Sequence, residues 1–222
     1  MIIASQNMEY KMTTTSTSTR TSSHILLLTV ATVLLAFALP QAGEWLQYDR
    51  SAIAEGQWWR IITSHLTHWT GSHLLWDLIM FVALAVSAQR ISKSCTYVTL
   101  LISAILIPIA VWIFQPEMIH YRGLSGLDSA LYVFVLLELI KKKSTKTKSA
   151  LLWIMLISFA AKVAYEFITG NTLFVQSMGA NISGVPLAHL VGGISGAIFA
   201  SIMKCNVDQR YMITSNKTDS IS

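Results

Sequence analysis

The sequence predicts an all-α integral membrane protein, folded as a bundle of six transmembrane helices. Of its 222 residues, 53% are hydrophobic and only 12% are charged, which is about half the charged fraction of an ordinary soluble domain. Long uncharged runs account for the missing charge, and each is near the length that a helix needs to cross about 30 Å of hydrocarbon. Because lipid offers the backbone no hydrogen-bond partners, these runs are expected to be helices rather than open strands.

Taken in order, the six runs define one membrane domain, 24–203, which follows a segment rich in Ser and Thr, 1–23, and precedes a tail, 204–222. The first segment has no apolar periodicity and is expected to be a disordered cytoplasmic terminus. The tail is expected to be cytoplasmic as well. The runs themselves lie at about 24–40, 72–89, 95–114, 123–140, 149–168 and 182–203.

The first run is the shortest and is open to a second interpretation. Residues 25–39 have the length of a signal-peptide core, and Ala36-Phe37-Ala38 is a candidate cleavage site. Cleavage there would leave five helices without changing the orientation of the rest. Met8 or Met12 is also an alternative start of the chain.

The placement of basic residues predicts the orientation. If the first run enters from the cytoplasm, the inner connections hold twelve Lys and Arg residues and the outer connections hold three, Arg50, Arg60 and Arg122. This asymmetry predicts that both termini are cytoplasmic. The basic run 141–148 is then a topology signal and not a nucleic-acid surface, which would need aromatic interleaving or a folded basic face. The outer connection 41–71 is rich in Trp and Tyr, so we expect it to lie in the membrane interface with Arg60 as an anchor.

Residues that bind metals are few. Cys95 and Cys205 both fall at cytoplasmic helix ends, so no structural disulfide is expected, and two cysteines cannot make a zinc site alone. His65, His68 and His73 straddle a loop and a helix start and lack the His-Glu-x-x-His spacing. We therefore expect no metal.

Four polar residues stand out, because polar groups inside a membrane span are costly and often functional. They are Ser125, His189, His73 and Asp77, on the fourth, sixth and second runs. Counted from the basic residues at the cytoplasmic ends at about 1.5 Å per residue, they lie roughly 24, 22, 25 and 20 Å above the inner face. The four side chains are thus predicted to share one layer in the outer leaflet.

Small residues provide a way for the serine and the histidine to meet. Gly192 and Gly196 form a small-xxx-small face on the His189 side of the sixth run, and Gly126 follows Ser125 on the fourth. Such faces let two helix backbones approach closely. A serine hydroxyl is a weak nucleophile until an adjacent base takes its proton, so this approach predicts a Ser–His pair.

These motifs resemble those of the rhomboid protease family, and more closely those of its small bacterial branch, the rhombosortases. The resemblance covers about 45–200, and Pro186 together with Tyr121-Arg122 before the serine motif favours the rhombosortase branch. The matching pieces, in order along the chain, are Trp59-Arg60, His73-xxx-Asp77, Gly123-Leu124-Ser125-Gly126 and Ala188-His189-xx-Gly192-xxx-Gly196.

The resemblance implies a serine–histidine dyad without a third acidic member and without a cofactor. Ser125 would attack the scissile carbonyl, and His189 would act as general base and then as general acid. The oxyanion would be held by His73, by backbone N–H groups near Ser125, and by the second-run residue that is usually Asn in the family. In this chain that residue is Asp77.

Two departures from the family pattern affect the expected site. An ionised Asp77 cannot donate a hydrogen bond, so either burial keeps it protonated or it has another role, such as fixing His73 or binding a substrate amide. The tyrosine found in many family members four residues after the serine is replaced by Ser129, which leaves the orientation of the catalytic histidine unexplained. Lys162 and Glu166 lie four residues apart on the fifth run and are expected to pair with each other.

The sequence-level interpretation is an intramembrane serine endopeptidase in a bacterial inner membrane, with its active site open to the periplasm. The branch resemblance implies that its partners are exported proteins whose C-terminal tails carry Gly-Gly, an apolar helix and a basic end. Water or an amine would then resolve the acyl-enzyme. The alternatives are a catalytically inactive rhomboid-like protein that binds membrane helices, and a small transporter, although no paired halves or broken helices are evident.

Overall fold

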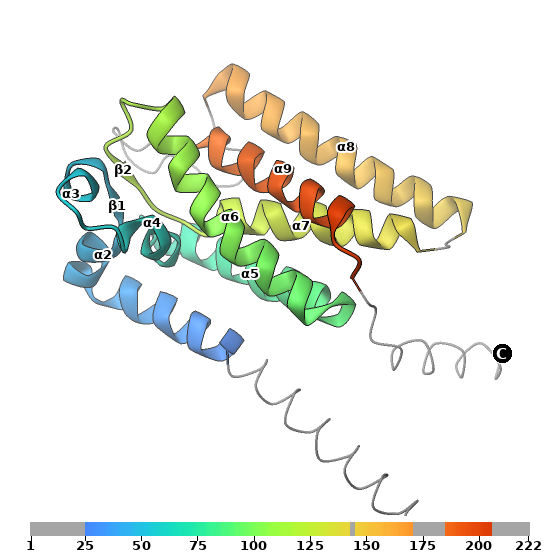
Figure 1. Ribbon diagram of the computed structural model, residues 1–222, viewed down its shortest axis with the longest axis horizontal. Helices are drawn as coiled ribbons and strands as arrows, with labels where there is room; N and C mark the ends of the chain where they lie inside the picture. Colours follow the sequence, from blue (N-terminus) through green and yellow to red (C-terminus); the bar gives the residue numbers. More distant parts are fainter. Residues whose placement is uncertain (1–24, 143–144, 171–184, 206–222) are drawn as a thin grey trace, which may run out of the picture.

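In the part of the chain that the structure describes, the protein is mainly helical, with one short pair of strands (Figure 1). The computed structural model describes residues 25–142, 145–170 and 185–205, so the N-terminal segment 1–23 and most of the tail 204–222 lie outside the described residues. After an N-terminal helix, Ile25–Ala38, the elements are α2 (Pro40–Leu46), β1 (Tyr48–Asp49), α3 (Arg50–Ala54), α4 (Arg60–Thr63), a 3₁₀ turn (Ser64–Leu66), α5 (Gly71–Ile91), α6 (Lys93–Phe114), β2 (His120–Tyr121), α7 (Ser125–Lys141), α8 (Lys146–Thr169) and α9 (Pro186–Ile202).

The fold class predicted from the sequence is confirmed, and a helix occupies each of the six predicted runs. The number of spans stays a prediction. Within the described residues, α5, α6 and α8 are long and apolar enough to cross a membrane, and helix Ile25–Ala38 adds a fourth span if it is joined to α2, from which it is bent by 112°. The helices α7 and α9 have 17 residues each, or roughly 25 Å at 1.5 Å per residue.

Local signals explain where the helices begin and end. The side chains of Thr70, Ser92 and Thr145 accept hydrogen bonds from backbone N–H groups in the first turns of α5, α6 and α8, which satisfies donors that a helix start leaves open. Pro186 opens α9, where its missing N–H costs nothing. Gly170 ends α8 in the left-handed conformation that glycine adopts without strain.

The centre of the bundle is α7. Eleven of its 17 residues are buried, and it packs against α9, α5, α6 and α8, with its closest packing on α9. By contrast α8 buries only Val163 and Glu166 among its 24 residues, and it covers the α7–α9 pair from one side (Figure 1). The first residue of α7, Ser125, is half-buried and directly precedes the buried Gly126 and Leu127.

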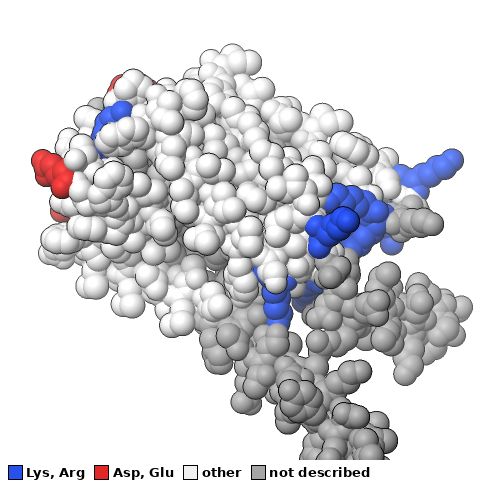
Figure 2. Space-filling model, viewed as in Figure 1, with Lys and Arg blue, Asp and Glu red and all other residues white. Residues whose placement is uncertain are grey.

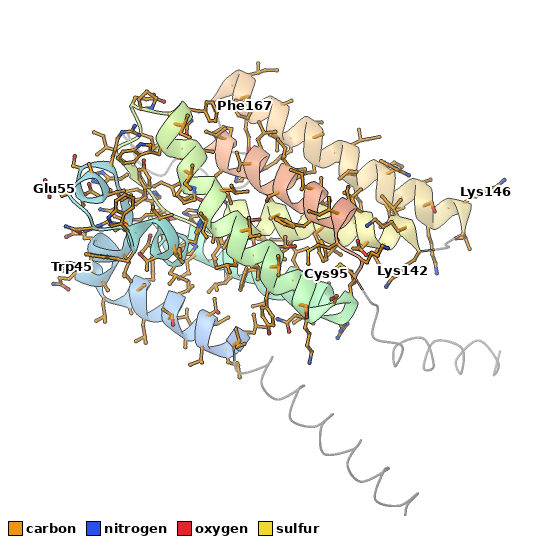
Figure 3. The ribbon with its side chains drawn as sticks, viewed as in Figure 1. Trp45, Glu55, Cys95, Lys142, Lys146 and Phe167 are labelled. Carbon is orange, nitrogen blue, oxygen red and sulfur yellow. A yellow bond between two sulfur atoms is a disulfide. The ribbon has the colours of Figure 1, made fainter. Side chains whose placement is uncertain are left out.

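Charge is separated along the bundle. Figure 2 shows most of the visible Lys and Arg side chains gathered at one end, a few acidic residues with a smaller basic patch near the other, and an uncharged surface between them. Figure 3 shows that Lys142, Lys146 and Cys95 lie at the basic end and that Trp45 and Glu55 lie at the opposite end. Many large apolar side chains along α5, α6 and α8 are exposed, as is typical of helices that face lipid.

The absence of a disulfide, expected from the sequence, is contradicted. Cys95 and Cys205 form a disulfide, with 6.1 Å between their Cα atoms, within the range that disulfide geometry allows. Both cysteines belong to the basic end of the bundle, where the first turn of α6 meets the chain that leaves α9. The expectation rested on the redox state of the compartment and took no account of this proximity.

Candidate active site

The end of the bundle opposite the lysines carries a folded platform. Strand β1 pairs with β2 antiparallel, with Tyr48 opposite Tyr121. Arg60 is only 7% exposed and donates hydrogen bonds to the Gln57 side chain at 2.8 Å and to the carbonyl oxygens of Glu44 and Gln47 at 2.7 and 3.0 Å. The expectation that Arg60 is an interface anchor is therefore wrong, because its guanidinium ties the turns of this platform together from the inside.

Gly123 connects the platform to the serine-bearing helix. Its backbone N–H donates to the Ser64 carbonyl at 3.3 Å, and its own carbonyl accepts from the Tyr121 hydroxyl at 3.2 Å. Its φ of 128° lies in the region that favours glycine, and an added Cβ would lie 2.9 Å from the His73 ring. Only glycine therefore suits this position, two residues before Ser125.

Asp77 holds the chain just before the serine. One of its carboxylate oxygens, Oδ2, accepts the backbone N–H of Leu124 at 2.9 Å and lies 3.2 Å from Nε2 of both His68 and His73. One backbone N–H and two imidazole nitrogens thus converge on one oxygen. A protonated carboxyl could give one proton but could not receive all three contacts, so the contacts fit an ionised Asp77 that accepts from both imidazoles and from the backbone.

Ser125 and His189 start neighbouring helices that touch along small residues. Ser125 is the first residue of α7, and His189 lies in the first turn of α9. An added Cβ on Gly126 would lie 3.2 Å from the carbonyl oxygen of Ala188, so the residues next to the serine and the histidine are in direct contact. On the same face, a Cβ on Gly192 would collide with the carbonyl oxygen of Gly126.

His189 has two charged neighbours on α8. Oε2 of Glu166 lies 2.7 Å from Nδ1 of the imidazole, and Nζ of Lys162 lies 2.9 Å from the same nitrogen. The predicted pair between Lys162 and Glu166 also forms, at 3.0 Å through the other carboxylate oxygen, Oε1. Tyr132, two turns along α7 from the serine, donates to the Met155 carbonyl of α8 at 3.3 Å.

The histidines of the outer loop differ in their surroundings. His65 lies between two backbone carbonyl oxygens, 3.3 Å from that of Gly123 and 3.1 Å from that of Ala104. Burial lowers the pKa of the His65 imidazole, and it also lowers the pKa of His68 against the opposing effect of Asp77. His68, His73 and Asp77 could place three ligand atoms within 4.8 Å of one another, whereas His65 is not part of this group. The mutual contacts of the three already account for their arrangement.

Comparison with known proteins identifies the family. The family model described as "Rhomboid domain" matches residues 55–206, which is more than half of the chain and includes all four polar residues singled out from the sequence. The chain belongs to the rhomboid family. Rhomboids are generally serine intramembrane proteases, and this rhomboid is a multi-pass membrane protein. It is also 24% identical over 188 residues to "Putative rhomboid protease YdcA" of Bacillus subtilis (strain 168), across 82% of this chain and 87% of the relative.

Among the described residues, His73 and Asp77 are in contact, Ser125 and His189 lie in the first turns of adjoining helices without a hydrogen bond between them, and Glu166 is an additional neighbour of the histidine. His73 and Asp77 meet next to the peptide that precedes Ser125, and His189 belongs to the adjoining turn of α9. Glu166 was assigned only to a pair with Lys162, although its carboxylate also contacts His189. The available sequence signal was an acidic residue inside an apolar run, near the same predicted depth as the serine and histidine.

Proposed function

We propose that this rhomboid is an intramembrane serine endopeptidase in which Ser125 is the nucleophile and His189 is the general base. The observation that carries the proposal is the contact between Gly126 on α7 and Ala188 on α9, because these two residues are the chain neighbours of the serine and the histidine. Membership of a family whose members are generally serine proteases supports it.

In the proposed reaction, Ser125 adds to the scissile carbonyl while His189 takes its proton, and the same proton later goes to the leaving amine. The backbone N–H groups at the start of α7 have no partner within their own helix, and a helix N-terminus favours negative charge. They are the first donors we assign to the oxyanion. We also assign His73 and Asp77 to the oxyanion and substrate-binding region, because they meet beside the Leu124 N–H that precedes the serine.

The substrates we propose are C-terminal membrane anchors of exported proteins that carry a Gly-Gly stretch. Support comes from the rhombosortase-like residues Tyr121, Arg122 and Pro186. Glycine near the scissile bond weakens a helix by about 1 kcal/mol per residue relative to Ala, which helps an extended strand to reach the serine. Either water or an amine on a lipid or modifying group would then resolve the acyl-enzyme.

We further propose a bacterial inner membrane location, with both termini cytoplasmic and the site open to the periplasm. The support is the charge separation, in which the lysine-rich connection 141–148 marks the cytoplasmic end. The end of the bundle that holds Trp45 and Glu55, opposite the lysines, would then lie at the periplasmic interface.

A reporter with a Gly-Gly tail tests the proposal. Wild-type protein is expected to remove the tail, whereas Ser125→Ala and His189→Ala are expected to leave it intact at equal expression. Matched controls are Ser87→Ala and His120→Ala, which change the same residue types at a half-buried position of α5 and an exposed position of β2. Tail removal by the Ser125→Ala variant would contradict the proposal that Ser125 is the nucleophile. Failure of the wild type on every tail tested would favour an inactive helix-binding rhomboid or a transporter.

Asp77 and the neighbouring histidines give a finer test of the same site. Asp77→Asn keeps an oxygen that can accept the Leu124 N–H and is expected to retain substantial cleavage. Asp77→Ala removes that acceptor and is expected to lose about 10-fold or more, because a buried donor is left unpaired. Loss in Asp77→Asn as complete as in Ser125→Ala would show that the charge itself is essential. Cleavage that survives a chelator would exclude a metal at His68, His73 and Asp77.

A further inference from the structure

Glu166 is the most enclosed charged residue on α8. Glu166 is only 1% exposed, and Val163 is the one other buried residue of α8. A carboxylate in this position must be paired, because an isolated charge inside a membrane span is costly. Lys162, one turn earlier, supplies a countercharge 3.0 Å from Oε1. The second carboxylate oxygen, Oε2, lies 2.7 Å from Nδ1 of His189.

The contacts of Nδ1 in His189 fix where its proton must be. Both the Glu166 carboxylate and the Lys162 ammonium lie within 3 Å of this nitrogen, but it cannot donate to one and accept from the other at once. A carboxylate only accepts, and its contact is the shorter one, so Nδ1–H donates to Glu166. Lys162 then donates to Glu166 rather than to the imidazole.

With the proton on Nδ1, Nε2 of His189 carries the free lone pair of the neutral ring. Among the described residues Nε2 has no hydrogen-bond partner, and the adjoining helix begins at Ser125. This is the tautomer that a general base needs. The family's tyrosine is absent at position 129, and Ser129 donates instead to the Ser125 carbonyl at 2.8 Å, so Glu166 supplies the orientation that the tyrosine would give.

We propose that Glu166 is a positioning residue that completes a Ser125–His189–Glu166 triad, an inference that rests on the proposed function. As the Ser125 oxygen bonds to the scissile carbon, its proton moves to Nε2 and the carbonyl electron pair moves to oxygen. Collapse of the oxyanion breaks the carbon–nitrogen bond, and the amine leaves with that proton. Throughout, the Glu166 carboxylate faces the imidazolium across the Nδ1–H bond and stabilises its charge.

Kinetics of the full chain in detergent, with the Gly-Gly-tailed reporter, test the inference. Glu166→Gln is expected to lower kcat by roughly 100-fold or more with little change in KM, since general-base catalysis contributes about 10² to 10⁴. Glu166→Asp, which keeps the charge, is expected to recover part of the loss. The matched control is Glu138→Gln, because Glu138 is also buried and pairs with a lysine, Lys141, at 2.6 Å, but at the far end of α7.

Nitrogen NMR of ¹⁵N-histidine-labelled protein gives a readout that needs no substrate. The signal of His189, assigned by its loss in His189→Gln, is expected to report a proton on Nδ1 in the wild type and a shift toward Nε2–H in Glu166→Gln. A purely structural glutamate would lower thermal stability without moving this signal or kcat. An unchanged tautomer, or kcat equal to wild type in Glu166→Gln, would overturn the triad.

The two arms separate this inference from the proposed function. If the wild type does not cleave the reporter, the proposed protease activity fails, and the tautomer of His189 alone then decides whether Glu166 orients the ring. If the wild type cleaves and Glu166→Gln cleaves equally well, the protease stands with a dyad and the triad is refuted. An equal fall in kcat for Glu166→Gln and Glu138→Gln would also refute it, because the loss would then reflect folding.

Discussion

Replacing Gly192 by alanine tests whether the close approach of α7 and α9 is what makes the site. An added Cβ would collide with the backbone carbonyl oxygen of Gly126 and would lie 3.0 Å from its carbonyl carbon, whereas carbon atoms prefer a separation of about 3.5–4.0 Å. The helices must therefore separate by roughly 1 Å or slightly more, because the collision with the oxygen is the more severe of the two. Because the obstacle is backbone, no side-chain rotation relieves it.

The two consequences of Gly192→Ala differ in size. Overpacking costs about 1–3 kcal/mol, and alanine returns about 1 kcal/mol through its higher helix propensity, so the net loss of stability is about 0–2 kcal/mol. A displacement near 1 Å between reacting groups can lower the rate roughly 100-fold. Reporter cleavage by protein reconstituted in lipid measures the rate, and thermal unfolding measures the stability.

The control for this substitution is Gly71→Ala, since a Cβ at Gly71 would meet only the Phe37 ring at 3.9 Å, an ordinary contact distance. It is expected to keep full activity. Gly196→Ala would collide with the carbonyl oxygen of Ala130, further from the serine, so its effect on cleavage should be smaller than that of Gly192→Ala. Wild-type cleavage by Gly192→Ala would refute the view that helix proximity assembles the site.

Three further changes follow from other contacts. Arg60→Ala removes the donor of three hydrogen bonds and should lower stability by about 2–5 kcal/mol in thermal unfolding, while exposed Arg90→Ala should not; equal melting temperatures would contradict this. Burial lowers the pKa of His65. Below about pH 6.5 the unfolded chain therefore binds a proton that the folded chain excludes, so the free energy of unfolding decreases as the pH is lowered. His65→Gln should flatten the fall in melting temperature between pH 7.5 and 5, unlike His120→Gln; the same slope in both variants would count against it. Cys95→Ser should cost up to about 4 kcal/mol by opening a loop of over 100 residues, and a reductant should abolish its difference from wild type; a difference that persists in reductant would argue against the disulfide.

The helices were largely predictable because the bilayer dictates them. Apolar length alone places the second, third and fifth runs within a few residues of α5, α6 and α8. The spacing of Gly192 and Gly196 also indicated which face of the last helix can approach another backbone. Such properties depend on residues close together in sequence, and they need no knowledge of the tertiary fold.

What the sequence could not predict depends on contacts between distant segments. Glu166 lies 23 residues before His189, and the apolar pattern of α8 does not show which side of the helix faces the bundle, because lipid accepts apolar residues all round. Arg60 follows two tryptophans, which suggested an interface position, but its guanidinium is buried and bonds to carbonyl oxygens more than ten residues earlier. The disulfide of Cys95 with Cys205 likewise depends on where two helix ends meet.

The central claim is that His189 activates Ser125, and the most direct measurement of it needs no knowledge of the substrate. Full-length protein in detergent is treated with a fluorophosphonate, which phosphonylates activated serines, and the modified residue is located by mass spectrometry. Our account predicts one modified serine, Ser125, with labelling lost in His189→Gln and retained in His120→Gln. Labelling elsewhere, or labelling of Ser125 that persists without His189, would contradict it.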